Sequence, residues 1–300
     1  MDVSERRQLA LMLAPFVVGL TALVAAPAVV TFALSLTEYD LIQQPRWIGL
    51  GNFRELVEDE VFRTALVNSL VFAAIAVPLR VLAALGLALL LHRRSVGVGP
   101  ARAAAVLPTV VPDVAYGLIW LWLFNPLYGP INVLLRSGGD NGLTIFGRLP
   151  PQWLTDPNDA RAAIILMSLF TIGEGFILLL VARQTIPGEL YELAAVEDAT
   201  WWDVFRRVTL PLIAPVLILL FLRDWILSFQ LNFVPALIVT DGGPPPYATT
   251  YLPLFVYRTG FEYLRYGYAA AATLVMLGLT AIVVLLQLRI FRLWASRSRS

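Results

Sequence analysis

The chain has 300 residues, 58% of them hydrophobic, and a mean hydropathy of +0.74, which is too apolar for a water-soluble domain and favours an integral membrane protein. With no Cys and a single histidine, His92, it excludes disulfides, thiolate metal sites, a histidine-cluster metal site and a Ser-His-Asp triad. All 22 basic residues are Arg, and a Walker A phosphate loop needs a Lys, so any ATP would have to be bound by another polypeptide.

Six apolar stretches are long enough to cross a bilayer, which takes about 20 residues. We expect one transmembrane domain, residues 1–300, of all-α fold, with spans at about residues 9–36, 65–91, 103–124, 162–182, 212–240 and 267–288. The first stretch has a rival interpretation as a cleavable signal peptide, because Ala26-Pro27-Ala28 is typical of a cleavage site. Its 28 uncharged residues are too many for a signal peptide, so a retained helix is favoured.

Four of the prolines inside these stretches are candidates for breaks: Pro78, Pro108, Pro112 and Pro235. Proline lacks the backbone N–H of a helical turn and its ring clashes with the turn before it. We therefore expect broken spans, which are common where helices line a cavity.

A polar segment, residues 185–211, separates the fourth and fifth spans and is predicted to form two short helices and a turn. Pro187 suits the first helical turn of the first helix. Glu189 and Glu192 place negative charge near the N-terminus of that helix, where it opposes the helix dipole. One apolar face follows from the helical spacing of Leu190, Leu193 and Ala194.

The second helix of this segment has its own start signal, because Thr200 and Asp203 have the spacing of a capping box. Pro211 is expected to end this helix. Its apolar stripe and the positive charge of its last turn come from Trp201, Val204, Phe205, Val208, Arg206 and Arg207. Periodicity alone leaves open an amphipathic surface hairpin without a partner.

The segment IPGELYELAAVEDATWWDVFRRVTLPLIAP resembles the EAA loop, the cytoplasmic coupling loop of ABC-importer permeases, and is closest to the carbohydrate-uptake branch of maltose and glycerol-phosphate type. Glu192 matches the motif Glu, Ala194 its second Ala and Ala199 the Ala after the Gly. Leu210, Pro211 and Pro215 match its exit. Leu193 stands where the first Ala is usual and Asp198 where the Gly is usual. Asp tolerates the left-handed conformation, so the turn is expected to be kept.

Softer matches extend the resemblance over nearly the whole chain after residue 45. WIGLGNFRELVEDEVFRTALVNSL is similar to the first external segment of sugar permeases, and it also suits an amphipathic helix on the outer leaflet. FNPLYGPINVLL resembles the exit of the third helix of these permeases. TDGGPPPYATTYLPLFVYRTGFEYLRYGYAAA resembles the segment before their sixth helix.

The resemblance implies a six-helix permease subunit of a binding-protein-dependent, ATP-driven importer, forming half of the path for a sugar or related solute by alternating access. The implied partners are a second permease in a heterodimer, two cytoplasmic ABC ATPase subunits that hold ATP and Mg, an extracytoplasmic solute-binding protein and the bilayer. No cofactor, metal or nucleic acid is expected on this chain, which would be a transport subunit and not an enzyme. The implied coupling residues are Glu189, Glu192, Ala194, Ala195, Asp198, Ala199 and Arg206.

The distribution of Arg predicts the orientation of the chain. Twelve Arg fall in the two termini and in the short loops on their side, eight fall in the segments on the other side, and Arg80 and Arg223 lie inside spans. Positive charge is retained in the cytoplasm, so we expect cytoplasmic termini and a cytoplasmic coupling loop. The resemblance implies residence in a bacterial or archaeal inner membrane.

Ionisable residues inside the spans cost about 2.5–3.5 kcal/mol each on insertion scales, so a role is expected for each. The residues are Arg80, Asp113, Glu174, Arg223 and Asp224. One interpretation is structural, with an Arg paired to an acid of another helix. The other is that some of these residues line a water-filled path.

Polar and aromatic spacing favours a sugar path, because such a path needs partners for hydroxyls and for sugar rings. Residues four apart share one helix face, and this applies to Asp224, Ser228 and Asn232 in the fifth span. The third span places Asp113, Tyr116 and Trp120 on one face. The candidate path residues are Asp224, Ser228, Asn232, Asp113, Tyr116 and Glu174. Packing of the same faces against the second permease is the alternative.

Two other functions stay open on the residues alone. A secondary transporter or channel would use Glu174, Asp113 or Asp224 as an ion site, but that gives no reason for the EAA-like loop. An intramembrane enzyme of aspartyl-protease type would need paired acids in recognised motifs, and these are missing. Within the loop, Trp201, Trp202 and Phe205 are expected to anchor the second helix to the spans.

Overall fold

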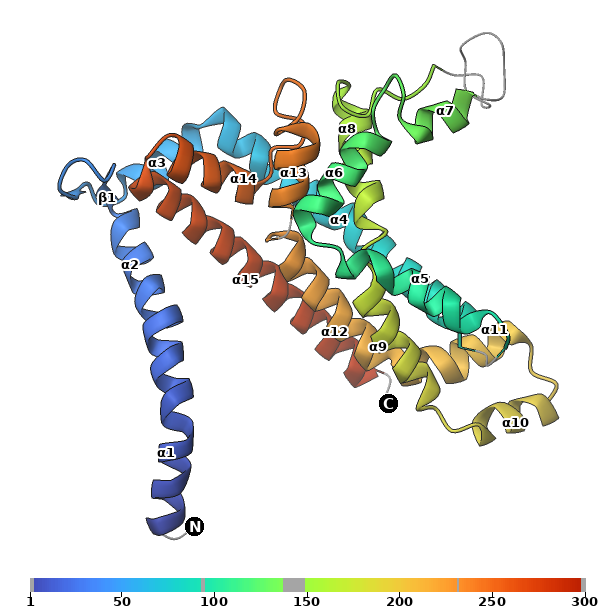
Figure 1. Ribbon diagram of the computed structural model, residues 1–300. Helices are drawn as coiled ribbons and strands as arrows, with labels where there is room; N and C mark the ends of the chain where they lie inside the picture. The colour runs from blue at the N-terminus through green and yellow to red at the C-terminus, as the bar shows by residue number, and fades with distance from the viewer. Residues whose placement is uncertain (1–2, 93–94, 137–148, 231, 298–300) are drawn as a thin grey trace. The chain divides into compact units, whose positions relative to one another are not determined.

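The structure is a computed structural model that describes residues 3–92, 95–136, 149–230 and 232–297 (Figure 1). It is mostly helical, and the strands β1 (Thr37–Glu38) and β2 (Arg46–Trp47) form a short antiparallel pair. By its contacts the chain divides into two units, Met1–Arg63 with Phe255–Leu279, and Thr64–Leu254 with Thr280–Ser300.

The first unit begins with one long apolar helix. It is built from α1 (Val3–Leu20), a π-helical turn at Thr21–Ala25 and α2 (Ala26–Ser35). Its hydrophobic side chains are exposed along its length, with Met12 at 80% and Leu23 at 78%. A helix that is apolar on all sides, and whose side chains are not packed against other helices, suits a lipid environment.

The rest of the first unit is held by polar contacts around α3 (Gly51–Glu58). The Asn52 amide donates hydrogen bonds of 2.9 Å to the carbonyl oxygens of Ser35 and Thr37. Arg265 donates a 2.7 Å hydrogen bond to Glu55, and this bond raises the pKa of the Arg265 guanidinium above its ordinary value. The unit also contains part of α14 (Leu252–Tyr257), a π-helical turn at Arg258–Glu262 and the start of α15 (Tyr266–Arg297).

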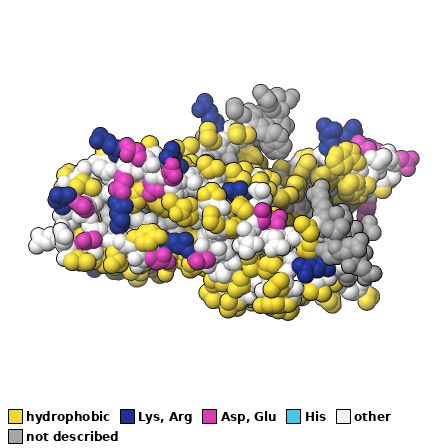
Figure 2. Space-filling model, turned by 90° about the horizontal axis from the view of Figure 1, so that it is seen from above, with side chains coloured by type: hydrophobic (Ala, Val, Ile, Leu, Met, Phe, Trp, Pro, Cys, Tyr) yellow, Lys and Arg dark blue, Asp and Glu magenta, His cyan; other side chains and the backbone are white. Residues whose placement is uncertain are grey.

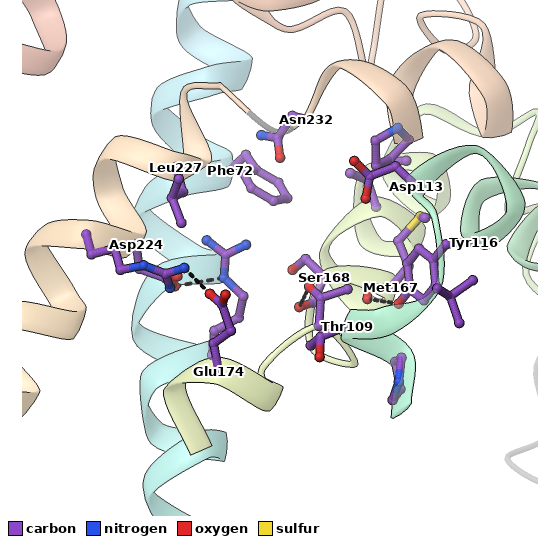
Figure 3. A pocket seen from close by; sticks show the side chains of 17 residues that line it. Phe72, Thr109, Asp113, Tyr116, Met167, Ser168, Glu174, Asp224, Leu227 and Asn232 are labelled. Carbon is purple, nitrogen blue, oxygen red and sulfur yellow. Dashed lines mark hydrogen bonds and ion pairs between the residues drawn. The ribbon is translucent and has the colours of Figure 1, made fainter. Parts of the chain in front are cut away.

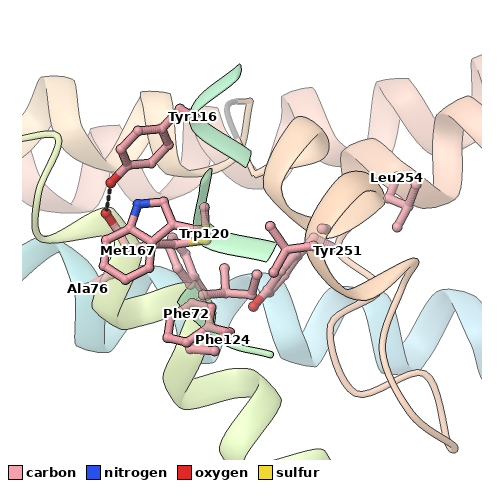
Figure 4. Packing of buried hydrophobic residues seen from close by; sticks show 12 residues of the cluster. Phe72, Ala76, Tyr116, Trp120, Phe124, Met167, Tyr251 and Leu254 are labelled. Carbon is pink, nitrogen blue, oxygen red and sulfur yellow. Dashed lines mark hydrogen bonds between the residues drawn. The ribbon is translucent and has the colours of Figure 1, made fainter. Parts of the chain in front are cut away.

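The second unit contains the remaining helices and two apolar cores. In chain order these helices are α4 (Glu60–Leu90), α5 (Val98–Val110), α6 (Asp113–Leu123), α7 (Pro130–Arg136), α8 (Pro157–Ser168), α9 (Gly173–Gln184), α10 (Glu189–Val196), α11 (Trp201–Val204), α12 (Leu210–Ser228) and α13 (Phe233–Thr240). One core packs Phe72 edge-on against Tyr251 at 5.4 Å between ring centroids and brings Trp120 against Phe124 at 4.9 Å (Figure 4). The first contact joins α4 to the loop before α14, and the second lies along α6 within the same core.

Among the described residues, four helices are long and apolar enough to cross a membrane, or up to six if two bent pairs each count as one span. The pair α5 and α6 bends by 103° at Val111 and Pro112, where a proline break is predicted. The pair α8 and α9 bends by 44° at residues 169–172, which no proline predicts. Figure 2 shows many hydrophobic side chains on the face in view, interspersed with charged ones.

Two of the four prolines do not break their helices. Pro78 lies inside the 31-residue α4 and Pro108 inside α5, so the expectation of breaks there is wrong. Membrane helices tolerate proline where neighbouring helices or local adjustments satisfy the freed carbonyl. The fifth predicted span does break, between Ser228 and Phe233, and Pro235 then lies in the first turn of α13, where its missing N–H is not needed.

Pro211 also does not end a helix, contrary to the prediction. From Trp201 to Ser228 the helix is continuous, through α11, a π-helical turn at Phe205–Thr209 and α12. In that wider turn the Leu210 N–H bonds to the carbonyl of Phe205, five residues back. The wider turn gives the proline ring room that a regular α-helical turn lacks.

Candidate functional site

A polar cavity of about 330 Å³ lies inside the second unit, among otherwise apolar helices (Figure 3). Ligand cavities in proteins usually start at about this volume. Its ionisable and hydrogen-bonding wall residues are Arg80 from α4, Thr109 from α5, Asp113 and Tyr116 from α6, Ser168 from α8, Thr171 and Glu174 around the start of α9, Arg223 and Asp224 from α12, and Asn232.

An ion pair between α4 and α12 forms one wall of the cavity. Nε of Arg80 lies 2.9 Å from a carboxylate oxygen of Asp224, and the two side chains are only 13% and 20% exposed. The guanidinium also donates to the Ser228 hydroxyl and lies 5.9 Å from the ring centroid of Phe72. Pairing of an in-span Arg with an acid of another helix, one of the two interpretations of the sequence, is therefore found here.

Ser228 takes a different place from the one that its spacing predicts. It is 1% exposed and is not part of the cavity wall. Its hydroxyl accepts a hydrogen bond from Arg80 behind the wall. Ser228 thus orients the guanidinium instead of facing the cavity.

A second ion pair joins α9 and α12 at a more open edge of the cavity. Arg223 donates to Glu174, and the side chains are 39% and 65% exposed. The start of α9 lies close to α5, because a Cβ atom added at Gly173 would lie 2.8 Å from the Thr109 side chain. A glycine is therefore needed where these two helices meet at the cavity.

Asp113 and Tyr116 project from the first turns of α6. Asp113 is exposed to the cavity, and its carboxylate lies at a helix N-terminus, where negative charge is favoured. Tyr116 lines the cavity with its ring, while its hydroxyl donates a 2.5 Å hydrogen bond to the Met167 carbonyl. Trp120 of the same predicted face is buried in the aromatic core and is not part of the wall.

Asn232 lines the cavity although it does not continue the face of α12. The helix ends at Ser228, and Asn232 stands in the turn before α13. Its side chain is 5% exposed, and its Nδ2 atom has no hydrogen-bond partner among the described residues. In Figure 3 the amide projects into the space between Phe72 and Asp113.

Three hydroxyl residues of the wall are missing from the sequence prediction: Thr109, Ser168 and Thr171. Thr109 and Ser168 stand at the helix ends next to the breaks at Val111–Pro112 and at residues 169–172, and Thr171 lies within the second break. Ser and Thr beside a break inside an apolar stretch are the signal that would have found them. Among the described residues, no group of three His, Asp or Glu side chains could hold a metal ion.

The predicted hairpin is present in the second unit, where α10 and α11 follow α9 (Figure 1). Asp198 has φ +50°, which is the left-handed conformation expected where the motif has Gly. Thr200 caps α11 by accepting from the Asp203 N–H at 3.2 Å, as its spacing predicts. Glu189 and Glu192 lie in the first turn of α10, and Pro187 stands just before that helix. The other predicted coupling residues of the hairpin are Ala194, Ala195, Ala199 and Arg206.

The two tryptophans of α11 do not anchor it to the spans, contrary to expectation. Trp201 is 71% exposed and Trp202 is 56% exposed, and the two rings pack on Phe205. Of these three aromatic residues, only Phe205 packs against the second apolar core, whose members include Ile186 and Ile213. The tryptophan rings therefore pack against each other and against Phe205, and not against an aromatic ring of another helix in the described part of the chain.

One side chain holds α10 to both neighbouring helices. The Tyr191 hydroxyl shares a 3.0 Å hydrogen bond with the buried Thr209 hydroxyl at the start of α12. The Arg183 guanidinium, from the last turn of α9, lies 4.0 Å from the centroid of the Tyr191 ring. The remaining apolar residues of α10 face outward, with Leu193 at 63% and Val196 at 83% exposure.

Residues 66–295 match the family described as binding-protein-dependent transport system inner membrane component. The chain belongs to this family. It is therefore a several-span inner membrane component, and a transport subunit, of a binding-protein-dependent transport system.

Named relatives cover nearly all of the chain. It is 30% identical to YesP, a probable ABC transporter permease protein of Bacillus subtilis, over 94% of this chain and 89% of that protein. It is 31% identical to SmoG, the sulfoquinovosyl glycerol transport system permease protein of Agrobacterium fabrum, over 97% and 92%. It is 28% identical to MalF, the trehalose/maltose transport system permease protein of Thermococcus litoralis, over 94% and 92%.

A solved structure shares the fold. The bacterial alginate ABC transporter, in complex with a periplasmic protein bound to an alginate pentasaccharide, has a chain that aligns with a TM-score of 0.79. The alignment covers 95% of this chain and 94% of that chain at 22% identity. The fold of the described helices is thus that of an ABC transporter membrane subunit.

The buried ion pair makes a stability prediction. Arg80→Leu should destabilise the protein by about 3–5 kcal/mol, because it leaves the Asp224 carboxylate buried without its partner. The double variant Arg80→Leu/Asp224→Leu should recover most of that loss. The measurement is the midpoint of thermal unfolding of the purified protein in nanodiscs.

Arg46→Leu is the matched control, because its pair with Glu38 is 75% and 61% exposed and should contribute little. Equal losses in the single and double variants would show that the pair is not the source of the effect.

Proposed function

We propose that the chain is one of two transmembrane subunits of an ATP-driven importer and forms half of the path for a sugar. Its partners are a second permease, two cytoplasmic ABC ATPase subunits that bind ATP and Mg, and an extracytoplasmic solute-binding protein. The path opens to alternate sides as the ATPases close and separate. The proposal is supported by the family, by relatives named for sugar transport and by the absence of Lys, which leaves the ATP to another chain.

The observation that carries the proposal is the polar cavity in an apolar bundle. Its wall combines hydroxyls, an amide and paired charges with the aromatic rings of Phe72 and Tyr116. Sugars present hydroxyls at their edges and C–H groups on their faces, so polar groups and rings together suit them. The charges are tolerated in the membrane because Arg80 and Arg223 are each paired with an acid.

The hairpin of α10 and α11 is proposed as the coupling element. Its charged residues and the outward-facing Leu193 and Val196 form a surface that the described part of this chain leaves uncovered. An ATPase docked there would bury that apolar surface, with Glu192 at the contact. The Arg distribution supports a cytoplasmic location for both termini and for the hairpin.

A secondary transporter or channel is not favoured. Of its three candidate ion sites, Asp224 and Glu174 are already paired with Arg80 and Arg223. An ion-binding carboxylate would have to lose such a partner in every cycle. That function also leaves the coupling hairpin without a role.

The test of the proposed function is reconstitution. The chain purified gently from its native membrane should bring the second permease and the ATPase with it, and this complex should accumulate sugar in liposomes only with ATP and the binding protein. Uptake by the chain alone in liposomes, with no ATPase present, would reject the importer.

Glu192→Lys should release the ATPase from the complex and lower uptake by about tenfold or more, because it reverses charge at the proposed contact. Membrane insertion should stay normal. Pull-down of the ATPase together with uptake measures both effects. Glu58→Lys, at an exposed position of α3, is the control and should change neither. Normal uptake by Glu192→Lys would remove Glu192 from the interface.

Tyr191→Phe should act differently, because it removes only the hydroxyl that bonds Thr209. The ATPase should stay bound, and the solute carried per ATP hydrolysed should fall about two- to five-fold, in line with the loss of one hydrogen bond of about 1 kcal/mol. Thr209→Val should have the same effect, and the double variant no more. Tyr128→Phe removes an exposed hydroxyl and is the control. An unchanged transport-to-hydrolysis ratio in Tyr191→Phe would contradict this role.

A further inference from the structure

The hydroxyl groups of the cavity wall act as hydrogen-bond acceptors toward a bound molecule. Four wall hydroxyls donate their protons to backbone carbonyl oxygens: Thr109 to Val106 at 2.6 Å, Ser168 to Ile165 at 2.7 Å, Thr171 to Ser168 at 3.0 Å and Tyr116 to Met167 at 2.5 Å. A hydroxyl that donates in this way offers only its lone pairs to a bound molecule. The hydroxyls that meet a solute there are therefore acceptors, and the charged donors of the wall are the guanidinium groups of Arg80 and Arg223.

The cavity wall has three carboxylates and two guanidinium groups. Each of the two guanidinium groups is engaged by a carboxylate, Arg80 by Asp224 and Arg223 by Glu174. Asp113 is the third acid, and it forms no ion pair with the residues that the structure describes. The wall thus carries one net negative charge, located at the N-terminal end of α6.

Asn232 adds a side-chain amide to the wall. Its Nδ2 atom is buried and has no hydrogen-bond partner among the described residues, although the residue lines the cavity. A fitting solute therefore has many O–H donors and no negative charge.

We propose that this half of the path takes an uncharged, hydroxyl-rich sugar and excludes anionic sugars, and that Asp113 sets this preference. The inference rests on the proposed function and narrows its substrate class. A carboxylated or sulfonated sugar would meet the Asp113 charge and the lone pairs of the hydroxyls without a free cation to receive it. The solved transporter for the acidic polysaccharide alginate is then expected to differ from this chain at the cavity wall.

The absence of Cys gives a direct probe of the cavity's charge. Ser168→Cys is introduced in the full importer, with Thr171→Cys as the second position should the first variant fail to fold. Labelling rates of this chain are followed by mass spectrometry for two methanethiosulfonates, cationic ethyltrimethylammonium and anionic sulfonatoethyl, each normalised to free cysteine. The cationic reagent should react at least about tenfold faster, because a cleft of one sign concentrates the opposite charge.

Asp113→Asn should bring the ratio of the two rates several-fold closer to one. Glu58→Gln, which removes a carboxylate of α3 outside the cavity, should leave the ratio unchanged. Equal labelling by the two reagents, faster labelling by the anionic one, or a ratio that ignores Asp113→Asn would each overturn the inference.

An uptake assay tests this inference separately from the proposed importer function. Liposomes with the full importer and its binding protein are offered maltose and an oligomannuronate, and ATP-dependent uptake is expected only for the neutral sugar. Uptake of the oligomannuronate at a comparable rate would overturn the inference and leave the importer standing. No ATP-dependent uptake of either probe would overturn both.

Discussion

The pairing of Arg80 with Asp224 is the constraint on which the cavity depends. Either charge alone in a membrane helix would be costly, and removing one would leave the other without compensation. Paired at 2.9 Å, and completed by the Ser228 hydroxyl, the two allow α4 and α12 to carry polar groups into an apolar bundle. The pair also fixes the last turn of α12. The turn that follows then brings Asn232 to the cavity.

The three helix breaks of the second unit have one physical role. Lining residues flank each of them: Thr109 and Asp113 at the first, Ser168 and Glu174 at the second, Leu227 and Asn232 at the third. Non-helical backbone is tolerated at membrane depth only where it is buried in protein or faces a water-filled cavity. Breaks therefore concentrate at the cavity, and the hydroxyls and carboxylates beside them supply its polarity.

Apolar length and local motif chemistry predict much of this structure, because both act within a few residues. The long helices follow from uninterrupted apolar stretches, and the turns at Asp198 and Thr200 follow from local backbone preferences. Tertiary partners decide the rest. Pro78 and Pro112 both lie inside apolar stretches, but only Pro112 stands at a helix break. Arg80 pairs with an acid that is 144 positions further along the chain. For the same reason, helical spacing could not distinguish Ser228, behind the wall, from Asp224, within it.

The continuous helix from Trp201 to Ser228 joins the hairpin to the cavity without an intervening loop. Its 28 residues span about 42 Å at about 1.5 Å per residue. Tyr191 contacts this helix at Thr209, near one end, and Asp224 pairs with Arg80 near the other. A shift of the hairpin that moves α12 along its axis must therefore move Asp224 relative to α4, or bend the helix. The π-helical turn at Phe205–Thr209 directly precedes α12. A bend at this turn would therefore let the segment from Leu210 to Asp224 move as one rigid body. Under the proposed function, the ion pair that makes the cavity possible is then also the contact that ATPase closure would strain.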